Sequence, residues 1–275
     1  MDLKKFAVRA LVTVIFAPFI LFCAWTGGYL FLAFVISLVV LGVNEFYALS
    51  VQKATYPEKI IGTIASAALC ITMFFSGASH AWLVLAAAII LLGTYELFRN
   101  QVGPILNLAT TLMGILYIAF SLSFLILIRE LPRESALEYR QGGQIMIAVF
   151  LAIWMSDTMA YVLGSQFGKH KLFERVSPNK TVEGTILGFL FAVGVAWVCQ
   201  ITFLDYMKLV HVVVIGVICG SVGQVSDLLE SLLKRDAGVK DSSNLIPGHG
   251  GVLDRFDSEI LVAPVVYIYL KFVVF

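Results

Sequence analysis

The stretch "TVEGTILGFLFAVGVAWVCQITF", residues 181–203, carries a single charged residue, Glu183, and is otherwise almost entirely apolar. A helix needs roughly 17 to 25 such residues to cross about 30 Å of hydrocarbon, whereas barrel strands would alternate over about 10 residues. The whole chain of 275 residues is similar, with 60% hydrophobic and 13% charged residues and a mean hydropathy of +0.93. A water-soluble core cannot absorb so much apolar surface, so the chain belongs in a bilayer.

Apolar runs separated by Gly, Pro and charge clusters predict an all-α, polytopic membrane bundle of about nine transmembrane helices. The expected ranges are 9–26, 29–50, 59–76, 81–98, 104–128, 144–164, 181–203, 209–230 and 257–274. The first 28 residues resemble a secretory signal, but their long apolar core ends in Trp25, so we expect an uncleaved first helix. Residues 1–143 would hold helices 1–5, and residues 144–275 the candidate catalytic helices 6–9 with their loops.

Charge placement predicts the orientation. With a cytoplasmic N-terminus, 14 of the 19 Lys and Arg residues face the cytoplasm and 5 face the other side. The two polar segments 168–180 and 231–258 are then cytoplasmic. A net charge of +1 excludes a nucleic-acid footprint. The cysteines each lie inside an apolar run without a close Cys or His partner, which predicts buried thiols rather than zinc ligands. They are Cys23, Cys70, Cys199 and Cys219.

The eighth expected helix ends in "SVGQVSDLLESLLKRDAG", which places acidic and basic side chains on one stripe. Asp227, Glu230, Ser231 and Lys234 follow one another at i, i+3, i+4 and i+7. A carboxylate at membrane depth costs about 2.5 to 3.5 kcal/mol, so Asp227 needs a partner or a function. The alternative is that Asp227 reaches interfacial water.

The next helix is expected to begin in "LDRFD", with Asp254 and Asp257 three residues apart on one face. One loop joins the two helices, so we expect these two carboxylates to converge with Asp227. Three carboxylates without His or Cys form a hard oxygen site, which suits Mg²⁺ shared with phosphate. The alternative is a set of structural ion pairs with Arg235 and Arg255.

Glycines in "PGHGG" could present backbone N–H groups to an anion, although such glycines more often only make turns. They are Gly248, Gly250 and Gly251. His249 between them could touch a phosphate, orient a carboxylate or cap the turn, and the sequence leaves these roles open.

A second anion site is expected at "SPNKTVEG". Ser177 and Pro178 predict a helix start, whose positive end would lie beside Lys180 and Thr181.

Further polar residues lie in apolar runs. Asp157 and Tyr161 are one turn apart, and Glu45 follows Asn44. A shared polar cavity on the cytoplasmic side would explain them, although for Glu45 and Glu96 an interfacial position is an equally good interpretation. The predicted cation site and anion sites lie in a protein embedded in the bilayer. This combination favours phosphoryl or nucleotidyl transfer, because such reactions depend on positioning and on charge neutralisation.

The charged segment resembles the signature of the phosphatidate cytidylyltransferases, also called CDP-diacylglycerol synthases, in residue type and spacing. The matching residues are Ser231, Lys234, Arg235, Lys240, Asp241, Pro247, His249, Gly250, Gly251, Asp254, Arg255 and Asp257. Upstream, "SDTMAY", "FGKHKL" and "VSPNKTVEG" resemble the bacterial members, so the likeness covers residues 150–260.

The resemblance implies a nucleotidyltransferase of the inner (plasma) membrane, with its active site facing the cytoplasm. CTP and phosphatidate would give CDP-diacylglycerol and pyrophosphate, with Mg²⁺ on Asp227, Asp254 and Asp257 and a second cation left open. Catalytic roles would fall to Asp227, Asp254, Lys234, Lys240 and Arg255. Substrate binding would fall to Ser177, Lys180, Thr181, Ser231, Arg235, Asp241, His249, Gly250, Gly251 and Asp157.

Two rival functions share part of this pattern. A CTP-dependent lipid kinase, or a cytidylyltransferase for another lipid phosphate, would use the same metal site with another acceptor. An anion transporter would need polar residues along a full path across the bilayer, but here the densest polarity stays on one side. Membrane lipids are expected partners, and the small residues of "GFLFAVG" (188–194) are one candidate face for a homodimer.

Overall fold

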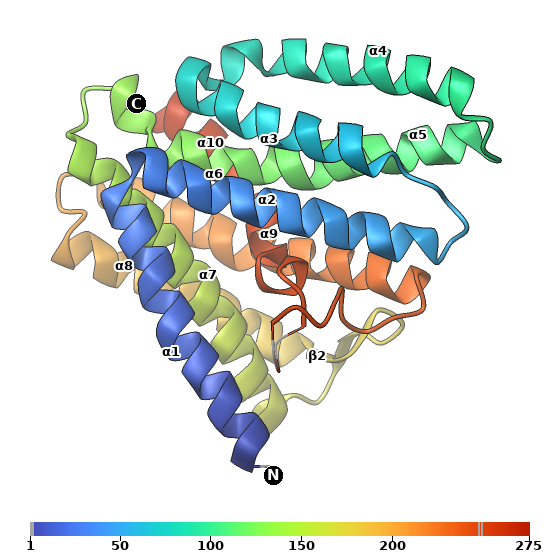
Figure 1. The fold of residues 1–275 in the computed structure, drawn as a ribbon. Helices are drawn as coiled ribbons and strands as arrows, with labels where there is room; N and C mark the ends of the chain where they lie inside the picture. The colour runs from blue at the N-terminus through green and yellow to red at the C-terminus, as the bar shows by residue number, and fades with distance from the viewer. Residues whose placement is uncertain (1–2, 247, 249) are drawn as a thin grey trace. The chain divides into compact units, whose positions relative to one another are not determined.

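The computed structural model describes residues 3–246, 248 and 250–275, and over this part of the chain all nine expected ranges are helical (Figure 1). The helices of the N-terminal half are α1 Leu3–Thr26, α2 Gly28–Val51, α3 Lys59–Ser76, η1 Gly77–His80, α4 Ala81–Arg99, α5 Pro104–Met113, η2 Gly114–Phe120 and α6 Ser121–Arg129. Those that follow are η3 Leu131–Arg133, α7 Tyr139–Phe167, α8 Val182–Thr202, α9 Leu209–Asp236, η4 Leu253–Arg255, α10 Asp257–Tyr269 and η5 Leu270–Val274.

Six helical segments among the described residues are long and apolar enough to cross a membrane. They are Gly28–Val51, Lys59–Arg99, Pro104–Arg129, Tyr139–Phe167, Val182–Thr202 and Leu209–Asp236. The second of these joins α3, η1 and α4 into one segment, whereas the apolar part of α1 described in full, Val14–Thr26, and the 13-residue α10 are shorter. The chain is therefore an all-α, multi-pass membrane protein, and the crossing count of nine stays a prediction.

The expected helix start at Ser177 and Pro178 is wrong. These residues belong to strand β2 (Ser177–Thr181), which pairs antiparallel with β1 (Lys171–Phe173). Proline lacks a backbone N–H and is tolerated in an edge strand as well as in a first helical turn. Helix α8 begins only at Val182, where the Thr181 hydroxyl accepts a hydrogen bond from the Gly184 N–H at 3.2 Å as the N-cap.

The expected shared face of Asp254 and Asp257 is also wrong. Asp254 lies in the short 3₁₀ helix η4, Phe256 breaks the helical path with φ −126° and ψ 19°, and α10 begins at Asp257. Helix α9, in contrast, runs further than expected, to Asp236. Lys234 therefore falls in its last turn, where a cation complements the helix dipole.

The chain forms two compact units. The first unit comprises Met1–Leu127 with Asp236–Phe256, and the second unit comprises Ile128–Arg235 with Asp257–Phe275. The sequence predicts a division by function after residue 143, with the catalytic helices in residues 144–275. The compact units do not test that functional division, so it stays a prediction.

Tyr47 is fully buried at the centre of the first unit, where α2, α3 and η2 meet. Its hydroxyl donates to the Thr111 carbonyl at 2.9 Å. Gly62 of α3 and Gly114 of η2 lie against its ring, and a Cβ at either position would overlap it. Two glycines facing one aromatic ring therefore let these helices approach closely.

Small residues hold the helices of the second unit together. Helices α7 and α8 run side by side (Figure 1), and a Cβ at Gly188 would lie 2.6 Å from the Ser156 carbonyl oxygen. Helix α9 approaches α8 in the same way, because a Cβ at Gly216 would lie 2.8 Å from Ala196 Cβ. Close backbone approach at small residues is a common source of helix association in membranes. Gly188 of the proposed dimer face thus packs inside the unit, whereas Gly194 has open space.

Candidate active site

Helices α7, α9 and α10 of the second unit supply a group of five acidic residues, here called the carboxylate cluster. Its members are Asp157, Asp227, Glu230, Asp257 and Glu259. Besides being buried, Asp257 interacts electrostatically with the other four carboxylates. Asp257 therefore lies in a negative field, which favours a cation at its side chain.

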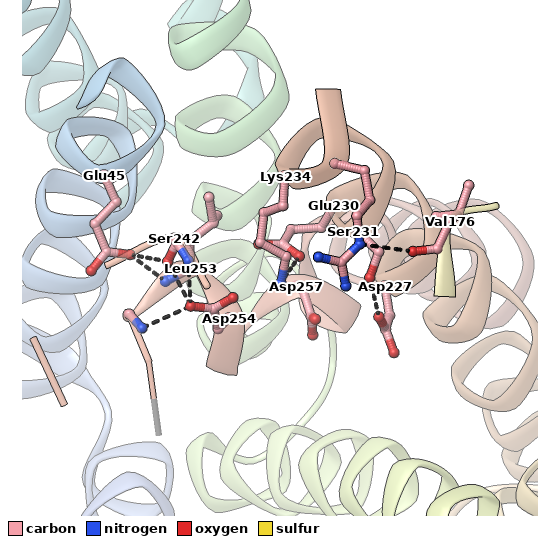
Figure 2. A network of polar contacts seen from close by, with 12 residues as sticks. Glu45, Val176, Asp227, Glu230, Ser231, Lys234, Ser242, Leu253, Asp254 and Asp257 are labelled. Atoms are coloured by element: carbon pink, nitrogen blue, oxygen red, sulfur yellow. Dashed lines mark hydrogen bonds and ion pairs between the residues drawn. The ribbon is translucent and has the colours of Figure 1, made fainter. Parts of the chain in front are cut away.

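The stripe predicted along α9 is confirmed (Figure 2). Ser231 Oγ donates to Asp227 Oδ1 at 3.3 Å, and Lys234 Nζ lies 2.5 Å from Glu230 Oε2. Lys180 of β2 forms an ion pair with Asp227, and these two side chains are 25% and 23% exposed. Two lysines thus compensate two members of the cluster, and the Lys180–Asp227 pair remains open to solvent.

Two serines connect α7, α9 and α10 beside the cluster. Ser226 Oγ donates to the Asp257 carbonyl oxygen and accepts from the Leu261 N–H at 3.3 Å. The Ser258 N–H donates to Asp257 Oδ1 at 2.7 Å, and its hydroxyl donates to Asp157 Oδ2 at 3.3 Å. Sequence reasoning missed both serines. Their only local signal is a small polar residue next to an acid within an apolar helix.

Side chains from α9 and α8 hold the β1–β2 hairpin and the residues just before it. Arg235 Nε at the end of α9 donates to the Val176 carbonyl at 3.2 Å (Figure 2). Glu183 at the start of α8 accepts from the N–H groups of Lys169 and His170 at 3.0 and 3.2 Å. Its other oxygen lies 2.6 Å from His170 Nδ1. These contacts fix the segment that carries Lys180.

In the first unit, Asp254 is buried and organises the loop between α9 and η4 (residues 237–252), here called the signature loop. Its Oδ2 accepts from the Ser242 N–H at 2.8 Å, the Ser242 hydroxyl at 2.8 Å and the Gly251 N–H at 2.7 Å (Figure 2). Gly250 has φ +81°, a left-handed conformation that glycine adopts without strain. The anion that meets the Gly251 N–H is therefore a carboxylate of the chain itself.

The remaining predicted residues of this region divide into two groups. Lys240, Asp241 and Arg255 are exposed. Pro247 and His249 lie outside the described residues. Asp254 belongs to the first unit, whereas Asp227 and Asp257 belong to the second. The expected convergence of the three aspartates therefore stays a prediction.

Glu45 and Glu96 are both buried within the first unit, and their depth in the membrane stays a prediction. Glu96 accepts from Asn107 Nδ2 at 2.7 Å and lies 3.4 Å from Arg99 Nη1. Glu45 accepts hydrogen bonds from Ser242, Ser243 and Val252 of the signature loop, and from the Leu253 N–H at the start of η4 at 2.8 Å (Figure 2).

The donor chemistry of the cluster fits Mg²⁺. This ion is bound in proteins by one or two carboxylates together with substrate phosphates and water, rather than by a cage of protein ligands. Among the described residues, no group of three or more His, Cys, Asp or Glu side chains could hold a metal ion on its own, so Mg²⁺ here stays a proposal that rests on donor type. Asp227 and Asp257 supply two hard oxygen donors in one unit, so the set fits a shared ion.

Comparison with known proteins agrees with this chemistry. The chain matches the cytidylyltransferase family over residues 7–273. A relative from Staphylococcus epidermidis, named phosphatidate cytidylyltransferase, is 32% identical over 265 residues, which cover 94% of each chain. Relatives of the same name from Staphylococcus saprophyticus and Synechocystis are 33% and 31% identical, and the alignments cover 94% and 89% of each chain.

The chain belongs to the cytidylyltransferase family, and it is a nucleotidyltransferase. The resemblance seen over residues 150–260 is confirmed, and it extends over nearly the whole chain.

Proposed function

We propose that the protein transfers the cytidylyl group of CTP to phosphatidate, giving CDP-diacylglycerol and pyrophosphate for phospholipid biosynthesis. The observation that carries the proposal is the likeness, over 94% of both chains, to proteins named phosphatidate cytidylyltransferase. The carboxylate cluster with its two lysines, set in a membrane protein, supplies chemistry suited to this reaction.

The chemistry needs no strong general base. The phosphate of the lipid is already an anion at neutral pH, so one of its oxygens can attack the α-phosphorus of CTP directly. A new P–O bond forms as the bond between the α-phosphorus and the bridging oxygen breaks, and pyrophosphate leaves with that electron pair. The barrier is mainly repulsion between anions, which positioned cationic side chains offset. Lys180 and Lys234 of the second unit are the first candidates, with Lys240 and Arg255 of the first unit as further ones.

Mg²⁺ is the proposed cofactor, held by Asp227 and Asp257 of the carboxylate cluster. When bound, it would neutralise phosphate charge and polarise the P–O bonds. Asp254 as a further ligand stays a prediction from the sequence, and a second cation is left open. Asp157 is proposed to act on the site indirectly, through Ser258, whose hydroxyl donates to Asp157 Oδ2 at 3.3 Å.

The proposed setting is the inner (plasma) membrane, with the N-terminus and the site on the cytoplasmic side and nine crossings in total. The distribution of Lys and Arg supports this orientation. Membrane lipids would surround the protein, and a homodimer is proposed only as a candidate state.

Pyrophosphate release from CTP, measured with the purified protein, phosphatidate and Mg²⁺ in detergent micelles, tests the function. We expect stoichiometric pyrophosphate and CDP-diacylglycerol, both dependent on phosphatidate. Release of CDP with a lipid alcohol as acceptor would identify a kinase instead, and product formation only with another lipid phosphate would change the acceptor. Uptake of an anion into vesicles without pyrophosphate release would identify a transporter.

A further inference from the structure

Glu45 of α2 is a buried carboxylate that lies next to the signature loop within the first unit. Its Oε1 accepts from the Ser243 hydroxyl at 2.7 Å and from the Val252 N–H at 2.9 Å. Its Oε2 accepts from the Ser242 hydroxyl at 3.0 Å and from the Leu253 N–H at 2.8 Å (Figure 2). The donors are Ser242 and Ser243 inside the loop, Val252 at its end and Leu253 at the start of η4, so one side chain binds two separate segments to α2.

The number and kind of these donors suit a carboxylate and no other side chain. A carboxylate has about four lone-pair positions and accepts at both oxygens. Two of the donors are backbone N–H groups, which have no acceptor capacity and cannot adapt to a different partner. A glutamine at this position would keep one accepting oxygen but would direct an NH₂ group at two donors.

The contact is also close. A Cβ at Gly251 would overlap both Glu45 Oε2 and the Ser242 hydroxyl, so the backbone of the loop lies directly against the carboxylate. A side chain at this position would have to displace the Ser242 hydroxyl or the Glu45 carboxylate from their hydrogen bonds.

Ser242 links Glu45 to Asp254. Its hydroxyl lies 3.0 Å from Glu45 Oε2 and 2.8 Å from Asp254 Oδ2. A hydroxyl has a single proton to donate, so the two carboxylates share it. Asp254 also accepts from the N–H groups of Ser242 and Gly251, which the Glu45 contacts hold in place. The orientation of the Asp254 carboxylate therefore depends on Glu45.

We propose that Glu45 is a positioning residue for cytidylyl transfer: by binding residues 242–243 and 252–253 to α2, it sets the orientation of Asp254. The inference rests on the proposed function. It assigns a role in the reaction to a residue of α2, far in sequence from the charged signature. Glu45 acts through the loop and need not contact a substrate.

The first test is the turnover of Glu45→Gln in the pyrophosphate assay at a temperature where the variant is folded. A misplacement of about 1 Å costs about 100-fold in rate, so we expect kcat to fall by about that factor. The KM values for CTP and phosphatidate should change by less than about threefold, because substrate contacts remain. Glu45→Asp keeps both accepting oxygens, and it should recover part of the loss, about tenfold over Glu45→Gln.

Glu96→Gln is the matched control. Glu96 is a buried acidic residue in α4 of the same unit, and it accepts from Asn107 rather than from the signature loop. We expect its kcat to stay within about threefold of the wild type even if its thermal stability falls. An equal loss of kcat in Glu96→Gln and Glu45→Gln would overturn the proposal, since both would then reflect general destabilisation.

A double-mutant cycle with Ser243→Ala adds a readout that does not depend on Glu45→Gln alone. Ser243 donates to Glu45, and its removal leaves the other three donors in place. If Glu45 acts through the loop, the double variant Glu45→Gln/Ser243→Ala should be no slower than Glu45→Gln. Independent, multiplying losses would contradict the proposal. If Glu45→Gln does not fold, the turnover of Ser243→Ala and Glu45→Asp tests the proposal instead. Wild-type kcat in both variants would overturn the positioning role of Glu45.

Hydrogen exchange separates this inference from the proposed function. In Glu45→Gln the amides of Val252 and Leu253 should exchange at least about tenfold faster, because their acceptor is weakened. Unchanged exchange would refute the binding of the loop by Glu45, whatever the reaction. A wild-type protein without pyrophosphate release would remove the proposed function and the positioning role with it. Wild-type release with unchanged kcat in Glu45→Gln would overturn the positioning role alone.

Discussion

Asp227→Asn separates chemistry from stability at the carboxylate cluster. The substitution keeps the shape of the side chain and removes one charge. The Lys180–Asp227 pair is about one-quarter exposed on each side, so its loss should cost about 1 to 2 kcal/mol, between the values for exposed and buried pairs. Removal of the strongest negative neighbour of Asp257 opposes that cost. The net loss of about 1 kcal/mol or less corresponds to a decrease of about 2 to 4 °C in Tm.

Turnover should respond far more strongly than stability. Loss of a group that stabilises transition-state charge typically costs about 100- to 1000-fold in kcat, and we expect a loss in that range. The assay is pyrophosphate release over a range of Mg²⁺ concentrations, with size-exclusion chromatography and thermal unfolding in the same detergent. The half-activating Mg²⁺ concentration should rise as well, because Asp227 is a proposed ligand.

Glu134→Gln is the control for Asp227→Asn. It removes a comparable ion pair of the second unit, in which Lys271 Nζ lies 2.6 Å from Glu134 Oε2 with 31% and 41% of the side chains exposed. We expect wild-type turnover for this variant, since the pair lies outside the carboxylate cluster. Full activity and unchanged Mg²⁺ dependence in Asp227→Asn would refute the metal assignment.

Three further predictions concern packing, capping and thiol access. Gly188→Ala should lower the free energy of unfolding by about 1 to 3 kcal/mol, because its methyl group would overlap the Ser156 carbonyl. Gly194 faces open space, so Gly194→Ala should be neutral or stabilising in thermal unfolding. Thr181→Ala should cost about 1 kcal/mol through loss of the α8 N-cap, and Thr181→Ser should restore it; equal Tm values for the two would contradict the capping role. Maleimide should label no cysteine in the folded protein and all of them after denaturation, since each is buried; the residues are Cys23, Cys70, Cys199 and Cys219.

The positions of the helices could be predicted from the sequence because long apolar runs leave few alternatives in a membrane. The stripe of Asp227, Ser231 and Lys234 was equally accessible, since helical spacing alone places these residues on one face. The hairpin was not, because Pro178 is compatible with both a first helical turn and an edge strand. Its pairing with β1 is a tertiary contact that no local pattern encodes.

The role of Glu45 was beyond sequence reasoning for a different reason. Its partner Ser242 lies 197 residues further along the chain, and the contact depends on the close approach of Gly251 to α2. In the sequence, Glu45 is only an acid near the end of an apolar run, a pattern that an interfacial position explains equally well. Nothing in the local sequence around Glu45 points to residues 242–253, and only the structure connects the two regions.

The carboxylates of this protein differ in how their charge is satisfied, and the difference bears on their roles. Glu45 and Asp254 accept from backbone N–H groups and serine hydroxyls, which are fixed neutral donors that a substrate cannot replace without unfolding the loop. Asp227 is instead compensated by a lysine on a partly exposed side chain, which can turn away at little cost.

Lys180 would then be able to turn to an incoming phosphate, if a cation that accompanies the nucleotide compensated Asp227 in its place. Such an exchange conserves charge on both sides of the pair, so neither group is left uncompensated while the substrate binds. A carboxylate bonded to neutral donors offers no comparable exchange. On this argument the lysine-paired Asp227 is suited to take part in the chemistry, and Glu45, bonded to neutral donors, maintains the architecture on which the chemistry depends.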